Sequence, residues 1–224
     1  MEEKKVVELK KREFTLREYI KKYLGKGKVS EVKIEYTPVG EKIIISTSKP
    51  GLVIGRGGEK ITELTKVVRK KFKLENPNLE IDEITEPEFN AQIIADEIAL
   101  ALERSGPLKF KVIAYRTLQR IIRAGALGVE IRLGGKLPGS RAKKWRFAQG
   151  YLKKVGDSAK VVDRAQSVSH TKPGVVGVKV AILSPYAKLF DKIEINEEFI
   201  KKIKEENQKI KESSIKKIKK VKKK

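Results

Sequence analysis

The stretch that decides the fold is Val53-Ile54-Gly55-Arg56-Gly57-Gly58-Glu59-Lys60-Ile61. A P-loop would end in Gly-Lys-Ser or Gly-Lys-Thr, whereas here Glu59 follows Gly58. The dinucleotide-binding fingerprint has another glycine spacing and comes directly after a strand, which this stretch does not. The sequence therefore excludes both common nucleotide-binding loops.

The glycines of this stretch suit a close approach to a nucleic-acid backbone. Gly55 and Gly58 carry no Cβ atom, so a sugar-phosphate chain can come near the main chain. Amide groups at the start of the next helix can face a phosphate. Arg56 adds positive charge within the loop, and Lys60 adds it one turn later. An ordinary glycine turn between two helices is the alternative interpretation.

Periodic patterns on both sides of the loop predict the surrounding elements. Thr15-Leu16-Arg17-Glu18 has the pattern of a capping box and predicts that a helix begins at Thr15. Alternation of apolar and charged residues predicts strands, and apolar residues three and four apart predict helices. The expected elements are a helix over 15–24, strands over 32–36 and 42–48, a strand over 79–85 and a helix over 89–104. Between the second and third strands, a helix is expected after Gly58, with Ile61, Leu64, Val68 and Phe72 on its inner side, and Asn76-Pro77-Asn78 breaks it.

The loop and its neighbours resemble the KH family of RNA-binding domains. Val53, Ile54, Gly55, Gly58 and Ile61 form the signature V-I-G-x-x-G-x-x-I, in which G-x-x-G links two short helices. The order of the expected elements corresponds to the type II arrangement. The resemblance implies a type II KH domain over residues 15–105, with a three-stranded sheet and helices, preceded by an N-terminal extension over 1–14.

Charge divides the 224-residue chain, whose formal net charge is +23, into three parts. Residues 1–105 carry 21 basic and 19 acidic side chains, whereas residues 106–190 carry 18 basic and only three acidic ones. The Lys-rich tail, residues 191–224, carries 13 Lys and seven acidic residues. A solvated surface of mixed sign explains the first part but not the second. The second part predicts a polyanionic partner, and nucleic acid is favoured over a membrane because no amphipathic helix with bulky aromatic residues appears.

The basic block over 106–190 has the pattern of a helix followed by a small sheet. A helix is expected over 108–123, with an apolar face and, on the opposite face, a stripe of Lys109, Arg116, Arg120 and Arg123. Four strands are expected over 129–133, 144–149, 160–168 and 175–183. The predicted fold class is α+β, with two domains: the KH domain and a C-terminal domain in which a helix covers a four-stranded sheet. Residues 197–212 could form a helix, and the chain from Lys216 is expected to be disordered.

Three further runs resemble the family of small-subunit ribosomal protein S-three, in its archaeal and eukaryotic branch. They are R-A-G-A-L-G-V-E-I at 123–131, G-G-K-L at 134–137 and H-T-K-P-G-V-V-G-V-K-V at 170–180. Together with the KH segment, the resemblance spans residues 15–190. It implies a structural constituent of the small ribosomal subunit that binds ribosomal RNA in the subunit head. It also implies that the protein lines the channel through which mRNA enters and contacts mRNA during translation.

From the resemblance and the charge pattern we expect ribosomal RNA, mRNA and neighbouring ribosomal proteins as partners, in the cytoplasm, with no membrane, cofactor or metal. The glycine loop and the basic block supply the expected RNA contacts. These residues are Gly55, Arg56, Gly57, Gly58, Lys60, Lys109, Lys111, Arg116, Arg120, Arg123, Arg132, Lys136, Arg141, Lys143, Lys144 and Arg146.

Catalysis is not expected, and two other functions stay open. The chain has no Cys and a single histidine, His170, so thiol chemistry is excluded and a Ser-His triad is disfavoured. Glu130, Asp157 and Asp163 are isolated acids without a partner at a local spacing. A free KH-type regulator of messengers is one alternative. A nucleic-acid lyase with a Lys nucleophile is the other, because many Lys are present although none is singled out.

Overall fold

The computed structural model describes residues 2–189 except 39, 73 and 75. Its first sheet follows from alternating apolar residues in three strands, β1 (Glu31–Thr37), β2 (Gly40–Thr47) and β3 (Asn78–Glu83). The strands lie in the order β1-β2-β3, with β1 antiparallel and β3 parallel to β2. A parallel neighbour needs a crossover connection, and the helices around the glycine loop provide it.

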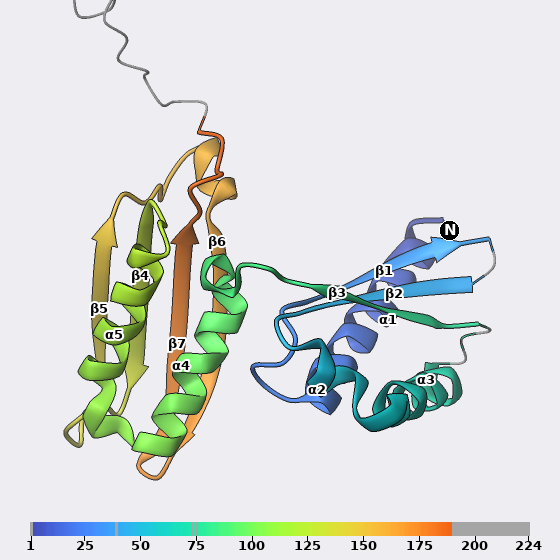
Figure 1. Cartoon of the computed structure of the whole chain (residues 1–224), viewed down its shortest axis with the longest axis horizontal. Coiled ribbons are helices and arrows are strands. Elements are labelled where there is room, and N and C mark those ends of the chain that lie inside the picture. The colour runs from blue at the N-terminus through green and yellow to red at the C-terminus, as the bar shows by residue number, and fades with distance from the viewer. Residues whose placement is uncertain (1, 39, 73, 75, 190–224) are drawn as a thin grey trace, which may run out of the picture. The chain divides into compact units, whose positions relative to one another are not determined.

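Three helices pack with the first sheet. They are α1 (Glu2–Leu24), α2 (Pro50–Ile54) and α3 (Glu59–Phe72), with a single 3₁₀ turn, η1 (Arg56–Gly58), between the last two. The element order is that of the expected type II KH domain (Figure 1). Apolar side chains from all three helices and two of the strands share one core, which consists of Leu16, Ile20, Leu24, Val29, Val32, Ile43, Ile45, Val53, Leu64 and Val68.

The prediction that the first helix begins at Thr15 is wrong, because α1 begins at Glu2. Residues 2–14 contain no Gly or Pro and are rich in residues that favour helices. The Thr15 hydroxyl donates a hydrogen bond to the Lys11 carbonyl oxygen inside the helix instead of capping its start. Buried Glu13 also pairs with Lys10 and Arg17, one turn away on either side.

The second sheet has four antiparallel strands in the order β5-β4-β7-β6. They are β4 (Gly128–Gly135), β5 (Lys143–Gly150), β6 (Asp163–Thr171) and β7 (Gly174–Leu183). The expected strand over 160–168 begins later than predicted, because a 3₁₀ helix, η4 (Asp157–Val161), precedes it. The fold class, α+β with a three-stranded and a four-stranded sheet, is confirmed.

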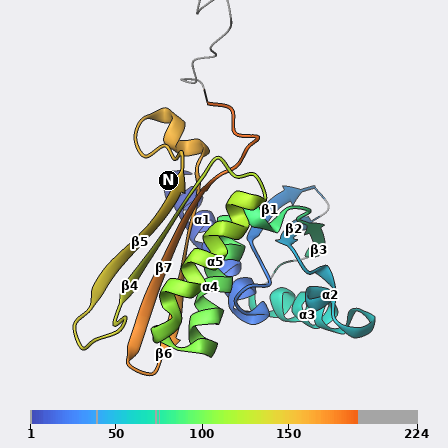
Figure 2. The ribbon, with the colours of Figure 1, turned by 60° about the vertical axis from the view of Figure 1, so that its left-hand side comes forward.

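Two helices, α4 (Ala91–Ser105) and α5 (Phe110–Arg123), cover one face of the second sheet (Figures 1 and 2). Short 3₁₀ turns, η2 (Pro87–Phe89) and η3 (Pro107–Lys109), precede them. We predicted one helix on this sheet and placed residues 89–104 in the KH domain. That placement of α4 is wrong, because its apolar residues, including Ile94, Ile98 and Leu102, pack in the core of the second sheet.

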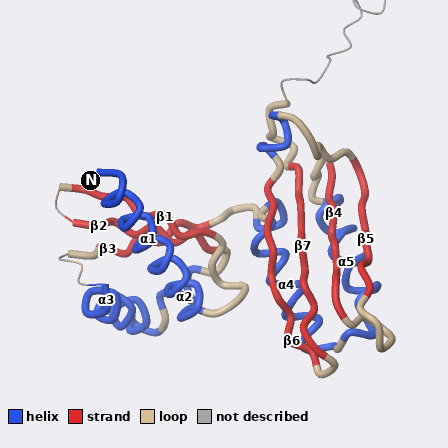
Figure 3. Tube along the Cα trace, turned by 180° about the vertical axis from the view of Figure 1, so that it is seen from behind, coloured by secondary structure: helices blue, strands red, loops and turns tan. Residues whose placement is uncertain are grey.

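No helix of residues 2–189 lies on the other face of the second sheet, as the view from behind shows (Figure 3). Side chains alternate across a sheet, so every second residue of each strand points to this face. On β4, buried Val129, Ile131 and Leu133 belong to the helix-covered core, which places Glu130 and Arg132 on the opposite face. We call this side the open face of the second sheet.

The expected helix over 197–212 and the expected disorder from Lys216 lie outside the described residues. Among the residues that are described, no helix combines the length and apolar character needed to cross a membrane.

Candidate nucleic-acid interface

The glycine loop presents bare main chain between two anchored helices. Val53 of α2 and Leu64 of α3 are buried in the first core and hold the two sides of the loop. Gly55 (φ 78°), Gly57 (φ 58°) and Gly58 (φ 81°) all adopt left-handed backbone conformations. These conformations favour glycine, so the loop is built from the residues that its geometry requires.

The space around the loop differs between its glycines. A Cβ on Gly55 would lie 2.8 Å from the Cγ of Lys60, so a side chain there would displace the lysine. A Cβ on Gly57 would meet no atom within 4 Å. Arg56 and Lys60 are both exposed beside this open backbone. The arrangement offers main chain and two cations to a phosphate-bearing strand.

Three residues of the expected basic stripe, Arg116, Arg120 and Arg123, lie on α5, and Lys109 lies in the turn η3 just before it. Phe110, Ala114, Leu118 and Ile121 are buried on its inner side, as the periodicity predicts. The predicted RNA-binding residues of this region are all exposed, and they are Lys109, Lys111, Arg116, Arg120 and Arg123.

Two of these cations already have partners within the protein. Arg120 makes a two-point contact with Glu97 of α4, in which Nη1 lies 2.8 Å from Oε1 and Nη2 bonds Oε2. The hydrogen bond to Glu97 raises the pKa of Arg120. The Lys111 Nζ lies 4.9 Å from the ring centroid of Trp145, which packs on Phe110. Arg116 and Arg123 form no ion pair among the described residues.

The hairpin between β4 and β5 carries another group of predicted contacts. Leu137 is buried in the second core and anchors the connection. Around it Lys136 and Arg141 are exposed, and so are Lys143 and Lys144 at the start of β5. The hairpin therefore adds four exposed cations at one end of the second sheet.

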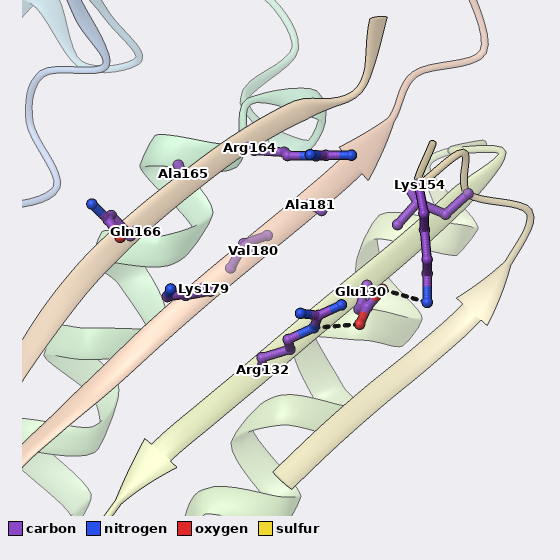
Figure 4. A pocket seen from close by; sticks show the side chains of 10 residues that line it. Glu130, Arg132, Lys154, Arg164, Ala165, Gln166, Lys179, Val180 and Ala181 are labelled. Carbon is purple, nitrogen blue, oxygen red and sulfur yellow. Dashed lines mark hydrogen bonds and ion pairs between the residues drawn. The ribbon is translucent and has the colours of Figure 1, made fainter. Parts of the chain in front are cut away.

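Arg132 and Arg146 meet on the open face through one buried carboxylate. Oε1 of Glu130 lies 2.5 Å from the Nε of Arg132 and 2.7 Å from the Nε of Arg146. Its Oε2 lies 3.3 Å from the Nζ of Lys154 (Figure 4). Only 3% of Glu130 is exposed. Burial by itself raises the pKa of this carboxyl, but the three hydrogen bonds outweigh burial and lower the pKa to about 2.

The predicted contacts of the second sheet thus lie on two sides. Those on α5 lie over the helix-covered face, whereas Arg132 and Arg146 lie on the open face. The prediction for Glu130 concerned a second carboxylate at a local spacing, and the partners that the structure shows are cations: Arg132 on the same strand, Arg146 on β5 and Lys154 after β5. Alternation within β4 places Glu130 and Arg132 on one face, and this local signal could have revealed their pairing.

Three cations of the open face were not predicted as contacts. Lys154, Arg164 and Lys179 line a hollow together with Arg132 and Glu130 (Figure 4). Period-2 alternation places Arg164 and Lys179 in their strands, but strand pairing is needed to bring them together. Among the described residues, no cluster of His, Asp or Glu side chains has the arrangement of a metal site.

Comparison with known proteins matches both parts of the chain. Residues 15–89 match the KH domain family, and residues 98–182 match the family described as ribosomal protein S3, C-terminal domain. The chain is 42% identical to small ribosomal subunit protein uS3 of Methanocaldococcus jannaschii, over 85% of this chain and 92% of that protein. It is 40% identical to the uS3 protein of Methanosphaera stadtmanae, over 80% of this chain and 71% of that protein.

Proposed function

Because the chain belongs to the family of small ribosomal subunit protein uS3, we propose that it is a structural component of the small ribosomal subunit that binds ribosomal RNA. Its partners are then ribosomal RNA and neighbouring ribosomal proteins, and its place is the ribosome in the cytoplasm. One observation carries the proposal beyond family membership. The cations of the second sheet are exposed, whereas Glu130, one of only three acids between residues 106 and 190, is buried beneath them. A surface of this kind suits a polyanion.

The finer proposal assigns the RNA contacts. The glycine loop (Gly55, Arg56, Gly57, Gly58 and Lys60) serves as a contact for single-stranded RNA. The exposed stripe of α5 contacts mRNA in the subunit head, at the channel through which mRNA enters. Arg116 and Arg123 support this assignment best, because neither is engaged by an acidic side chain of the described chain. The hairpin cations Lys136, Arg141, Lys143 and Lys144 bind ribosomal RNA.

The role is non-enzymatic. A lyase needs a lysine whose nucleophilicity comes from desolvation or a cationic neighbour. All described lysines are at least partly exposed, which weighs against that alternative. A free KH regulator would not need the basic second domain, and that domain matches a ribosomal family over residues 98–182.

Sedimentation of a native lysate through a sucrose gradient tests the proposal. We expect the chain to migrate with the small subunit at constant stoichiometry and to remain after a high-salt wash. Absence from that peak, or loss in modest salt, would refute a structural role. Borohydride trapping on abasic DNA then tests the lyase, and RNA binding by a chain shortened at residue 105 tests the free regulator.

A further inference from the structure

The strands of the open face bring cations into one transverse row. In the register of the sheet, Arg146 of β5 lies opposite Arg132 of β4, and Arg132 lies opposite Lys179 of β7. Gln166 of β6 continues the row beyond Lys179. Neighbouring strands are about 4.8 Å apart, so the three cations start from backbone positions within about 10 Å.

Such a row is unfavourable for the isolated protein. Like charges directly opposite each other on neighbouring strands destabilise a sheet. Glu130 offsets part of this repulsion at Arg132 and Arg146. Neither Lys179 nor Arg164 forms an ion pair with a described residue, and both line the hollow beside Glu130 (Figure 4). The repulsion is relieved when an anion binds across the row.

Between these cations the surface lies close to the backbone of the sheet. Ala181 lies opposite Glu130 on the next strand. Its short side chain leaves room for a hollow of about 400 Å³, which Arg132, Lys154, Arg164 and Lys179 also line. A ligand can therefore reach the level of the sheet while the cations close around it.

From this geometry we propose that the open face of the second sheet binds the sugar-phosphate backbone of duplex RNA, with Glu130 as the residue that positions its arginines. The face differs from the α5 stripe and the glycine loop, and it rests on the proposed function only in taking RNA as the partner. Charge complementarity favours RNA, because five cations (Arg132, Arg146, Lys154, Arg164 and Lys179) surround a single acid.

A duplex fits the face better than a single strand does. Proteins that hold single strands on a sheet stack bases on aromatic side chains. The described residues that line the hollow are of the types Glu, Arg, Lys, Gln, Ala, Leu and Val, and none of them is aromatic. Contacts to phosphate without base stacking recognise the RNA backbone, and such recognition does not depend on the base sequence.

Glu130 directs its arginines in a way that suits phosphate. The two arginines, Arg132 and Arg146, each donate a hydrogen bond to Glu130 from the Nε atom. The terminal Nη atoms, which fork onto phosphate oxygens, therefore project beyond the carboxylate. Held in this way, the arginines lose less conformational entropy when RNA binds.

The test uses the full chain and a 20-base-pair RNA duplex of mixed sequence, followed by fluorescence anisotropy between 50 and 400 mM KCl. The double variant Arg132→Gln with Lys179→Gln removes two cations of the row. We expect its affinity to fall at least tenfold at about 100 mM salt. The salt slope should become shallower by about 1.8, which corresponds to two phosphate contacts.

The matched control is Arg12→Gln with Lys33→Gln, which removes the same charge from exposed positions of α1 and β1. We expect less than a twofold change in its affinity. An equal loss in both double variants would mean that net charge alone acts, and it would overturn the proposal. An unchanged affinity of the Arg132/Lys179 variant for duplex RNA would also overturn the proposal. This includes the case in which the variant keeps its RNA affinity but loses binding to an oligo-glutamate peptide, which would mean that the open face binds an acidic peptide.

Glu130→Gln tests the positioning role separately. If only net charge matters, Glu130→Gln should bind RNA more tightly, because the variant loses a negative charge. Positioning predicts binding that is about threefold weaker, with partial rescue by Glu130→Asp and a native circular dichroism spectrum. Tighter or unchanged binding would refute the positioning role.

The failure of this proposal can be told apart from that of the proposed function. If the wild-type chain binds no RNA and does not sediment with the small subunit, the proposed function fails. If the wild-type chain binds duplex but the Arg132/Lys179 variant binds equally well, only the open face is refuted. A 20-nucleotide oligo(U) serves as the second probe, and we expect the variant to lose less affinity for it than for the duplex.

Discussion

Glu130 on β4 accepts a 2.7 Å hydrogen bond from the Nε of Arg146 on β5, sixteen residues further along the chain. This contact joins a buried carboxylate to an exposed guanidinium across two paired strands. It explains how a surface so rich in cations accommodates an acid. The acid lies below the surface, where it holds cations in place and adds little negative potential at the level of a ligand.

The depressed pKa of Glu130 predicts a pH dependence of stability. Its pKa is lowered from 4.5 to about 2 in the folded chain, so the folded state favours the ionised form. The stabilisation is complete above about pH 4.5 and is lost as the pH falls towards about 2. We expect it to amount to about 1 to 2 kcal/mol, because its partners are half-exposed and screened by solvent.

Urea unfolding of the wild type and of Glu130→Gln, at several pH values from 7 down to 2.5, measures this contribution. The difference in free energy of unfolding between the two should shrink as the pH falls. A difference that stays constant with pH would show that the ionised form of Glu130 is not what stabilises the fold.

The ion pair between Arg120 and Glu97 predicts unequal roles on α5. Arg116→Ala should reduce the salt slope for oligo(U) binding by about 0.7, the value for one phosphate contact on a single strand. Arg120→Ala should reduce it by less than half as much, because Glu97 already occupies the guanidinium. Glu97→Gln should free Arg120 and strengthen binding. Equal effects of the two alanine variants would contradict this ranking.

The glycine loop can be tested at Gly57 without disturbing the fold. Its backbone angles, φ 58° and ψ 16°, are left-handed values that Asp and Asn tolerate, and a Cβ there meets no atom within 4 Å. Gly57→Asp should weaken oligo(U) binding about tenfold, whereas Gly57→Asn, of equal size but uncharged, should weaken it much less. If both variants bind as the wild type does, the loop does not contact RNA.

Close packing beside β4 predicts contrasting effects of two Gly→Ala changes in one strand. A Cβ on Gly128 would lie 1.9 Å from the carbonyl oxygen of Tyr151, whereas a Cβ on Gly134 would lie 3.6 Å from the Cγ of Lys144. Gly128→Ala should therefore lower the free energy of unfolding by about 3 kcal/mol or more, and Gly134→Ala should change it little. Chemical denaturation measures both, and similar values would show that the backbone at Gly128 relaxes easily.

Elements with a long periodic pattern could be predicted from the sequence. The exact start of a helix and the contacts between distant segments could not. The apolar face of α5 and its basic stripe follow from helical periodicity and were confirmed. The start of α1 was missed because a capping pattern at Thr15 can also occur within a continuous helix. The place of α4 was missed because its apolar face would suit either core, and periodicity does not say which one it joins.

The sequence by itself determined the KH arrangement and the basic character of the second domain. The V-I-G-x-x-G-x-x-I pattern is contiguous in the chain, and charge composition is independent of folding. Only the tertiary structure decided how the cations are divided between two faces and which of them acids engage. The reason is that strand register brings Arg146, Arg132 and Lys179 side by side from distant positions in the chain, and no local pattern encodes that register.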